Sequence, residues 1–522
     1  MRYDIVFGGK AGQGPNILTE VVSEGLIKKG FYVFYSRDYQ SLIRGGHNFN
    51  MLSFSDTPIY SNSSKIDILV CLDKNTLDIH KKSLKNKGII LKGEEENMFF
   101  AGAVYKILGI DFKILEDELR KLHNYEENVK HARRGYENEN EHLHLRKVIN
   151  NMEMQVRERK LKLPELTNPT QNLIFINGSQ AISLGAVNSG LDYYYAYPMT
   201  PATPVLTELS QMQLEKNMKH KTIELENEIA VIITGLGSSI AGKKVMVGSS
   251  GGGFDLMTEG LSMAGQAEIP IVVYLSSRPG PGTGVATYTS QGELNLALYS
   301  GHGEFSRIVL APGDPKECKE LTNQAFYFSQ KYKTPSIVLT DKHLAEAKYL
   351  SENNPKLLPV ENSIIELKRY NSYEHDENEK SIATEDKKII KKNFERRMKK
   401  QEEINKEAEN FEMFKIYGKE NSKNLIIGWG STKGAILDAI SEGKIDAKFI
   451  QILYMEPFSR KIKKILEEAR NIIIVENNST SPLSGLIAQK TGIIINDKNK
   501  ILRYDGRPFF SDELAKEIKE RL

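Results

Sequence analysis

The chain has 522 residues, of which 40% are hydrophobic and 27% are charged. This length is too great for one hydrophobic core, so we expect about three domains. The 71 basic and 68 acidic residues give a formal net charge of +3, which gives no reason to expect nucleic acid or an anionic membrane as a partner. No apolar run approaches the ~18 residues of a membrane helix, and the N-terminal MRYDIVF is typical of a strand, so we expect a cytoplasmic protein.

The cysteine count argues against disulfide and metal chemistry within this chain. Its two cysteines, Cys71 and Cys318, lie far apart, and there is no CxxC pair. We therefore expect neither a disulfide framework nor a thiolate-bound zinc or iron–sulfur site, and we interpret both thiols as buried and inert. The histidines of residues 115–165 lack the spacing of metal ligands, so we predict no metal site.

The first segment, residues 1 to about 115, alternates strand and helix patterns, which favours a parallel or mixed α/β sheet. Strands are predicted at Asp4–Phe7, Tyr32–Tyr35, Asn50–Phe54, Ile66–Cys71 and Gly88–Leu91. The charged residues 115–165 are predicted to form solvated helices that connect domains.

Two loops of the first segment could bind a ligand. FGGKAGQGPN (7–16) lies between a strand and a helix, and Gly9, Gly12 and Gly14 would let backbone amides approach a phosphate. Its spacing departs from the dinucleotide fingerprint, so a structural turn and a phosphate site both remain open. In SLIRGGHN (41–48), Arg44 and His47 flank a glycine pair, which fits a surface turn or a functional loop.

The second segment, about 172–350, is rich in glycine and small residues. The apolar runs Lys243–Ser250 and Ile269–Ser277 predict strands that are buried on both faces, as in a parallel sheet, and both lead into Gly-rich loops. Ligands of such sheets bind at the carboxyl ends of the strands. We therefore look for the functional site in these loops.

The loop YAYPMTPAT (195–203) holds the first candidate residue of this segment. Pro198 and Pro201 fix φ on both sides of Thr200, so the threonine hydroxyl should be held rigidly at a strand end. A rigid hydroxyl in that position suits substrate orientation, although a plain loop could also use these prolines.

A carboxylate is the second candidate. Glu224, Glu226 and Glu228 precede a helix of apolar and small residues, and the helix dipole alone can account for acids there. Glu228, however, directly precedes the apolar run 229–232, so we expect its carboxyl to be partly removed from water. Such a carboxyl suits proton exchange with a heterocycle.

An arginine is the third candidate. Arg278 follows the second buried strand and begins a Gly/Pro-rich loop that also contains Thr283 and Thr287. A guanidinium with neighbouring hydroxyls can hold a carboxylate through two hydrogen bonds. The alternative is a surface salt bridge.

The remaining chain is predicted to hold a linker and a third domain. Within the charged stretch 361–420, Thr384 is predicted to cap a helix, which would dock on a neighbouring surface, and its apolar residues form a narrow stripe of Ile390, Phe394 and Met398. Residues 421–522 alternate again, with strands at Leu425–Ile427, Phe449–Ile452 and Ile472–Val475 and helices beginning near Lys433, Ser459 and Leu483. The predicted fold is therefore α/β, with three doubly wound, Rossmann-like domains (1–165 with its charged linker, 172–350 and 421–522) and a charged helical linker at 361–420.

These motifs together resemble the 2-oxoacid:ferredoxin oxidoreductase family, in the alpha subunit whose γ and α parts are fused. FGGKAGQGPN, SLIRGGHN and NMFFAGAVYKILGID resemble the γ part, whereas NGSQAISLGA, YPMTPAT, ENE, SSGGGF, RPGPGTG and GHGEF resemble the pyrimidine-binding domain. IVENNSTSPLSGLI and YDGRPF resemble the transketolase C-terminal-like domain. The resemblance covers nearly the whole chain, in the family's order.

The resemblance implies roles for the candidate residues. Glu228 matches the glutamate that hydrogen-bonds N1′ of thiamine diphosphate, which makes the 4′-amino group a base for the C2 proton. Thr200 matches a threonine near the bound 2-oxoacid, and Arg278 and Thr287 match the groups that bind its carboxylate or carbonyl. Pro198, Gly251 and Gly252 of the matching motifs are implied to line the cofactor. In the γ part, the loop with Gly9, Gly12, Gly14 and Arg44 is implied to face coenzyme A.

The motifs that this chain lacks imply a partner. In this family the diphosphate and its Mg²⁺ sit on a GDG…N motif of a β subunit, which also holds a [4Fe–4S] cluster, and this chain has neither GDG nor a cysteine cluster. The implied enzyme is a heterodimer, or a dimer of heterodimers, that oxidatively decarboxylates a 2-oxoacid such as pyruvate or 2-oxoglutarate. Coenzyme A would be converted to an acyl-CoA with release of CO₂, and ferredoxin would take the electrons.

Two alternatives remain open on the sequence. An indolepyruvate-type oxidoreductase subunit would share the same loops, and a non-catalytic nucleotide-binding scaffold could keep the fold. The absence of GDG argues against a transketolase. SSGGG and GPGTGVAT also replace the usual TSGPG and GPSTG, and we expect these changes to affect substrate preference.

Overall fold

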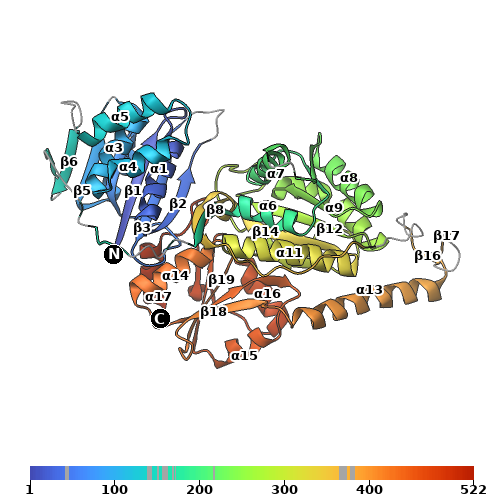
Figure 1. The fold of residues 1–522 in the computed structure, drawn as a ribbon. Coiled ribbons are helices and arrows are strands. Elements are labelled where there is room, and N and C mark those ends of the chain that lie inside the picture. Colours follow the sequence, from blue (N-terminus) through green and yellow to red (C-terminus); the bar gives the residue numbers. More distant parts are fainter. Residues whose placement is uncertain are drawn as a thin grey trace. The chain divides into compact units, whose positions relative to one another are not determined.

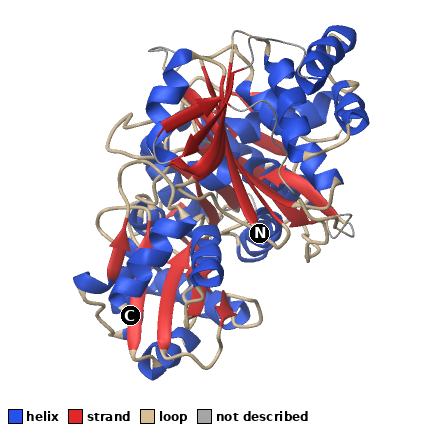
Figure 2. Cartoon of the chain, turned by 90° about the vertical axis from the view of Figure 1, so that its left-hand side faces the viewer, coloured by secondary structure: helices blue, strands red, loops and turns tan. Residues whose placement is uncertain are grey.

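The structure is a computed structural model that describes residues 1–40, 46–93, 95–137, 144–149, 152–155, 161, 163–166, 170, 172–215, 218–363, 373–376 and 382–522. It divides into two compact units, which are described separately (Figures 1 and 2). The first unit contains Met1–Phe175, Ala347–Asn353 and Phe510–Leu514, and the second contains Ile176–Glu346, Asn354–Phe509 and Ala515–Leu522.

The first unit is built on a mixed sheet in the order β7-β6-β5-β4-β1-β3-β2-β15, followed by β8 (Leu173–Asn177). Strands β1 (Arg2–Gly9), β4 (Ile66–Cys71) and β5 (Leu84–Lys92) are parallel, whereas β3 (Asn48–Ser55), β2 (Tyr32–Asp38) and β15 (Lys348–Glu352) are antiparallel to their neighbours. The strands predicted in this segment are confirmed, because their apolar runs are buried. The helices are α1 (Pro15–Lys28), α2 (Lys74–His80), α3 (Asn97–Leu108), α4 (Phe112–Leu119) and α5 (Tyr125–Glu137).

The prediction of solvated connecting helices over residues 115–165 is wrong in two respects. β6 (His144–Ile149) and β7 (Met152–Gln155) are strands that extend the sheet beyond β5. Helix α5 packs directly against α3, because Gly102 and Gly135 let the two backbones approach closely. A Cβ on either glycine would lie 1.8–1.9 Å from a carbonyl oxygen of the other helix.

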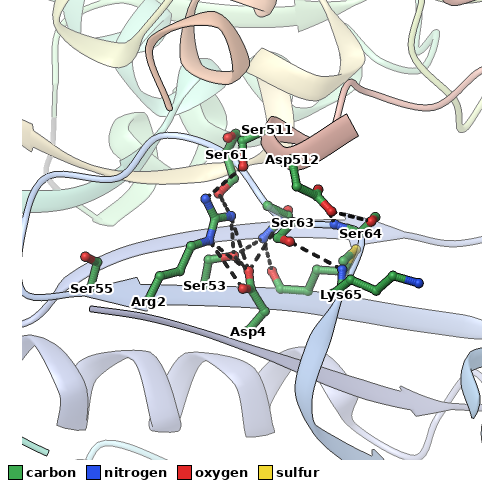
Figure 3. Close-up of polar contacts among 12 residues, drawn as sticks. Arg2, Asp4, Ser53, Ser55, Ser61, Ser63, Ser64, Lys65, Ser511 and Asp512 are labelled. Carbon is green, nitrogen blue, oxygen red and sulfur yellow. Dashed lines mark hydrogen bonds and ion pairs between the residues drawn. The ribbon is translucent and has the colours of Figure 1, made fainter. Parts of the chain in front are cut away.

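The short segment Phe510–Leu514 belongs to the first unit through polar contacts with the chain's beginning (Figure 3). Arg2 donates to the Ser511 hydroxyl at 2.9 Å and also pairs with Asp4 at 3.2 Å. The backbone N–H and hydroxyl of Ser64 donate to the Asp512 carboxylate at 2.8 and 2.6 Å. Residues that are about 450 to 510 positions apart therefore form one hydrogen-bonded cluster.

The second unit contains a seven-stranded sheet in the order β10-β9-β11-β12-β14-β13-β21. Its strands are β9 (Tyr193–Ala196), β10 (Lys221–Glu224), β11 (Val245–Ser249), β12 (Ile271–Ser277), β13 (Ile308–Leu310) and β14 (Pro335–Asp341), all parallel, and the antiparallel β21 (Tyr454–Glu456). β11 and β12 are the strands predicted at Lys243–Ser250 and Ile269–Ser277, and they are buried throughout. The helices of this part are α6 (Gly178–Asn188), α7 (Thr203–Glu215), α8 (Glu228–Ile240), α9 (Gly251–Ala267), α10 (Leu294–Tyr299), α11 (Pro315–Tyr332) and α12 (Lys342–Glu346).

A second sheet of this unit has the order β18-β20-β19-β22-β23. Its strands are β18 (Phe414–Gly418), β19 (Asn424–Trp429), β20 (Lys448–Ile452), β22 (Asn471–Glu476) and β23 (Lys500–Leu502), and only β18 is antiparallel to its neighbour. Helices α14 (Thr432–Gly443), α15 (Lys461–Glu468) and α16 (Pro482–Thr491) begin close to the predicted positions, and α17 (Ser511–Arg521) ends the chain. The three predicted strands are confirmed, and so is the α/β class.

The two sheets of the second unit share one continuous hydrophobic core and a buried charge cluster. Glu317 of α11 accepts from Lys433 at 2.6 Å, from Lys415 at 3.0 Å and from Gln451 at 2.6 Å. Although Glu317 is fully buried, these two ammonium groups hold the pKa of its carboxyl down at about 2. Removal of one partner would leave an uncompensated buried charge, so each member of the cluster depends on the others.

Helix α13 (Lys387–Ala408), the long helix next to the strand pair β16–β17 (His375–Asp376 and Ile382–Ala383) in Figure 1, departs from the prediction. Its N-cap is Asp386, which accepts from the backbone N–H groups of residues 388 and 389, and not Thr384. The docked face of its first half is polar, because Arg397 pairs with Glu374, and Arg396 and Lys400 pair with Glu268. The apolar stripe faces water instead, with Phe394 38% and Met398 44% exposed.

Candidate active site

Three loops that follow neighbouring parallel strands form the candidate active site. β9, β11 and β12 lie side by side, and they end at Ala196, Ser249 and Ser277. Parallel strands end at the same edge of a sheet, so the loops that begin after these residues meet there. The loops contain Pro198 and Thr200, Gly251 and Gly252, and Arg278, in that order.

Glu228 lies at the first position of α8 with its carboxyl buried, and the residue is only 2% exposed. Asn227 caps the helix by accepting from the backbone N–H of residue 230 at 2.9 Å. The Ser249 hydroxyl at the end of β11 donates to Oε1 of Glu228 at 3.1 Å. The expected removal of this carboxyl from water is therefore confirmed.

Gly253 makes room for that carboxyl. A Cβ at position 253 would lie 2.1 Å from Oε1 of Glu228 and 2.2 Å from the Ser249 hydroxyl, which no side chain could tolerate. Of the apolar run 229–232 on which the expectation rested, Val231 and Ile232 are buried, whereas Ile229 is 51% exposed. Gly253 and Ser249 were not among the predicted site residues, although both stand in the SSGGGF motif.

Arg278 is buried, with 7% of its surface exposed, so a surface salt bridge is excluded. Its Nη1 donates to the backbone carbonyl oxygen of Thr200 at 2.6 Å, which brings two predicted residues together. The contact uses the Thr200 carbonyl, and the hydroxyl of this half-buried residue is left for another partner. Burial lowers the pKa of Arg278, although the nearby carboxylates of Glu293 and Glu228 act in the opposite direction.

The glycines at the start of α9 are close to the other loops. A Cβ on Gly251 would lie 2.6 Å from Oε1 of Glu293, and one on Gly252 would lie 3.4 Å from the carbonyl oxygen of Gly282. The hydroxyl of Ser250, the N-cap residue of α9, is buried without a hydrogen-bond partner in the described part of the chain. This end of α9 therefore leaves polar hydrogen-bonding capacity unused.

Thr287 was predicted as a substrate-binding residue, but the structure does not bring it into hydrogen-bonding contact with the other predicted residues that it describes. It is half-buried in the loop after Arg278, and no hydrogen bond links its side chain to Arg278 among the described residues. The following part of this loop is held by the C-terminal YDGRPF motif. There the backbone N–H of Thr289 donates to Gly506 at 3.1 Å, and Arg507 stacks on the Tyr288 ring at 3.9 Å.

Glu293 is a buried acid that the sequence did not single out. It is 8% exposed and lies at the N-cap position of α10. Burial raises the pKa of Glu293 to about 7, although the Ser277 hydroxyl and the backbone N–H and charge of Arg278 oppose this rise. The only sequence signal was an acid directly before an apolar helical pattern.

The Gly-rich loop of the first unit borders a large cavity. Gly12 and Gly14 have φ of +90° and +73°, a left-handed conformation that favours glycine, and the Gln13 side chain ties the loop to the carbonyl oxygen of Leu72 at 2.9 Å. The cavity has a volume of about 1310 Å³ and lies beside the carboxyl ends of β4 and β5. Its lining includes the charged residues Lys10, Lys74, Lys92, Asp73, Glu95 and Glu96, and also His131.

Of the second loop in this unit, Arg44 lies outside the described residues, whereas His47 is described. Nε2 of His47 is 2.9 Å from Nε2 of His80, so one imidazole donates to the other. Burial lowers the pKa of both rings, that of His80 to about 4, with the charge of the other ring adding to the effect at His80. Both rings are therefore neutral near pH 7, and His47 belongs to a half-buried pair.

The burial of the two cysteines is as expected. Cys71 and Cys318 are both buried, and they are not joined by a disulfide. None of the helices in the described ranges is long and apolar enough to span a membrane. Within those same ranges, no group of three or more His, Cys, Asp or Glu side chains is placed to hold a metal ion.

Two family models match the chain. Residues 184–416, which include Thr200, Glu228 and Arg278, match the pyruvate flavodoxin/ferredoxin oxidoreductase, thiamine diP-binding model. Residues 4–96, which include the Gly-rich loop, match the pyruvate ferredoxin/flavodoxin oxidoreductase model.

Individual proteins also resemble the chain over most of its length. The 2-oxoacid:ferredoxin oxidoreductase subunit alpha of Sulfolobus sp is 30% identical over 99% of this chain and 96% of its own. The 2-oxoglutarate synthase subunit KorA of Methanocaldococcus jannaschii is 30% identical over 58% of this chain and 88% of its own. A 2-oxoglutarate:ferredoxin oxidoreductase from Magnetococcus marinus, solved with 2-oxoglutarate, coenzyme A and succinyl-CoA bound, has a TM-score of 0.85 at 22% identity over 100% of this chain and 99% of that one. The solved structure supports the fold. The 30% identity over 99% of this chain shows that it belongs to the family of 2-oxoacid:ferredoxin oxidoreductase alpha subunits.

Proposed function

We propose that the chain is the catalytic alpha subunit of a thiamine-diphosphate-dependent enzyme that oxidatively decarboxylates a 2-oxoacid. The 2-oxoacid would lose CO₂, and its acyl group would pass to coenzyme A to give an acyl-CoA. Ferredoxin would accept the electrons of this oxidation. The observation that carries this proposal is the buried carboxyl of Glu228, which Gly253 and Ser249 enclose, at the same edge of the sheet as the buried Arg278.

These residues fit the aminopyrimidine of thiamine diphosphate. The buried Glu228 carboxyl can share a proton with a ring nitrogen, and the unpartnered Ser250 hydroxyl can contact a polar ring substituent. Gly251 and Gly252 leave space beside them, and Pro198 shapes the facing loop. When bound, the cofactor supplies an electron sink at the carbon that loses CO₂.

The substrate's carboxylate would bind beside this carboxyl. Arg278 offers a buried positive charge with donors beyond the one that Thr200 accepts, so it can hold a carboxylate through charge-assisted hydrogen bonds. The free hydroxyl of Thr200 is placed to orient the 2-oxo group, and Thr287 would join when the loop after Arg278 closes on the substrate. Arg278, Thr200 and Thr287 thus bind and orient the substrate.

Coenzyme A would use the Gly-rich loop of the first unit. Gly9, Gly12 and Gly14 lie beside a cavity whose lining includes three lysines and three acids, so the backbone amides of the Gly-rich loop and the lysines would contact the phosphates. Arg44 of the neighbouring motif would add a further cation. The size of the cavity, about 1310 Å³, leaves room for a nucleotide-bearing ligand.

A β subunit would complete the site with the diphosphate, its Mg²⁺ and a [4Fe–4S] cluster. The chain's two cysteines are buried, and it has no GDG motif. A surface for such a subunit lies next to Glu228, because Ile229 and Ile233, one turn apart on α8, are 51% and 50% exposed and Leu256 of α9 is 48% exposed. Exposed apolar side chains grouped in this way mark protein–protein contacts. The complex would be a heterodimer or a dimer of heterodimers.

The test is co-production of the chain with a subunit that carries the GDG motif, followed by an assay of viologen dye reduction. Pyruvate, 2-oxoglutarate and a branched 2-oxoacid should be compared, because relatives are named for 2-oxoglutarate and for ketoisovalerate. We expect reduction that requires coenzyme A, thiamine diphosphate and at least one of these acids. Absence of reduction with every acid would favour the non-catalytic scaffold.

A matched pair of variants tests the role of Glu228. Glu228→Gln should lower kcat by ~10²–10⁴-fold, the usual contribution of a positioned acid or base, while the complex still assembles. Glu226→Gln, which neutralises an exposed carboxylate two positions earlier, should leave kcat unchanged. A normal rate in Glu228→Gln would refute the cofactor assignment.

A further inference from the structure

The candidate site contains a second buried carboxyl whose hydrogen bonds are incomplete. Glu293 is 8% exposed, and its Oε2 lies buried without a hydrogen-bond partner within the described ranges. An ionised carboxylate in such a place is costly, so this carboxyl is suited to taking up a proton or to losing its charge when a ligand arrives.

Glu293 and Glu228 act on the same guanidinium. Oε1 of Glu293 lies against Gly251, where a Cβ would be 2.6 Å away, and the backbone N–H of Arg278 acts on the Glu293 carboxyl. Burial lowers the pKa of Arg278, whereas the negative charges of Glu293 and Glu228 raise it. Two buried acids and one buried cation therefore influence one another electrostatically at the sheet edge proposed for the substrate's carboxylate.

We propose that Glu293 is a positioning residue that controls the access of the substrate's carboxylate to Arg278. Ionised Glu293 neutralises the guanidinium and repels an incoming carboxylate. Protonated Glu293 leaves the positive charge of Arg278 to the substrate. This inference rests on the proposed function, since it takes Arg278 as the substrate's anchor.

Proton uptake should consequently accompany substrate binding. A carboxylate bound to Arg278 removes the charge that stabilises ionised Glu293, so the carboxyl gains a proton. Burial already raises the pKa of Glu293 to about 7, and substrate should raise it further. Because protonation is lost as the pH rises through this pKa, affinity for the 2-oxoacid should fall above neutral pH.

The experiment measures KM for the preferred 2-oxoacid against pH in the assembled enzyme. For the wild type we expect KM to rise by roughly 10-fold between about pH 6 and about pH 8.5, the size that one ionisation near neutrality gives. Glu293→Gln, which is neutral at every pH, should show a flat KM. Glu467→Gln, an exposed carboxyl on α15, should keep the wild-type profile.

Calorimetry supplies a readout that does not depend on turnover. Binding of oxamate, or of N-oxalylglycine if 2-oxoglutarate is the substrate, is measured for the wild-type complex in two buffers of different ionisation enthalpy. We expect net uptake of a proton at about pH 8, and none in Glu293→Gln. A wild-type KM that is independent of pH, a Glu293→Gln profile like the wild type's, or binding without proton uptake would each overturn the inference.

The outcomes separate this inference from the proposed function. If the complex oxidises a 2-oxoacid and depends on Glu228, but the profile and proton uptake do not involve Glu293, only the role of Glu293 is refuted. If the complex oxidises no 2-oxoacid, the proposed function itself fails, and the inference fails with it.

Discussion

The carboxyl edge of the seven-stranded sheet and that of the first unit's sheet differ in whether their charged residues are buried or line an open cavity. At the first, Glu228, Glu293 and Arg278 are each less than 9% exposed, and the charges of the two acids raise the pKa of the arginine, against the effect of burial. At the second, Lys10, Lys74 and Lys92 line an open cavity of about 1310 Å³ together with acids and His131. The same topological position therefore supports two kinds of site.

The difference indicates what each edge can do. Charges removed from water interact strongly and shift pKa values, which is what proton transfer and carboxylate selection require. Charges around a wide, wet cavity are screened and act additively, which suits retention of a large polyanionic ligand without chemistry at its phosphates. Under the proposed function, the first edge performs the reaction and the second holds coenzyme A.

The largest of these effects is expected at the carboxyl edge of the seven-stranded sheet, here called the dry edge, when a side chain fills the space beside the Glu228 carboxyl. Gly253→Ala would place a Cβ 2.1 Å from Oε1 of Glu228, so the carboxyl or α9 must move. Because displacement of a catalytic group by about an ångström is costly, we expect kcat to fall by ~10²-fold. Steady-state dye reduction by the assembled complex measures the loss.

A control for that variant comes from the neighbouring helix. Gly237→Ala on α8 adds the same methyl group where no other atom lies within 4 Å, so activity should be kept and the helix slightly stabilised. Equal activity in Gly253→Ala and in Gly237→Ala would mean that Glu228 does not need its enclosed position.

A smaller effect is expected from Arg278→Ala, and it should fall on KM. Loss of charge-assisted hydrogen bonds to the substrate's carboxylate costs ~1.5–3 kcal/mol, so we expect KM for the 2-oxoacid to rise by roughly 10- to 100-fold. KM for coenzyme A should change little. If KM for the 2-oxoacid stays constant, Arg278 only supports the Thr200 loop through its hydrogen bond to the backbone.

The sequence predicted those parts of the fold that short-range patterns determine. β11 and β12 were found because continuous apolar runs identify strands that are buried on both faces. For α13 the four-residue apolar spacing identified a real stripe, but which face docks depends on Glu268 and Glu374, which no pattern within the helix contains. The strands β6 and β7 were missed because they lie within the strongly charged stretch 115–165.

The same limit applies to the candidate site. Thr200, Glu228 and Arg278 each stood in a recognisable loop, and the contact between Arg278 and Thr200 follows from parallel strands ending together. Glu293 was missed because its burial depends on packing beside Gly251 and Ser277, which are distant in sequence. Gly253 was missed because one glycine in a run of three cannot be distinguished until its neighbours in space are known.

The smallest effect is expected at the open edge, from the loss of one cavity lysine. Lys92→Ala removes one of several screened charges, worth ~0.2–1 kcal/mol, so KM for coenzyme A should rise only ~2- to 5-fold and the rise should shrink at high salt. Lys113→Ala, an exposed lysine on α4, should have no effect on that KM. A 100-fold rise in Lys92→Ala would mean that this lysine acts as a desolvated, specific contact. The open edge would then resemble the dry edge in its chemistry, and the contrast between them would fail.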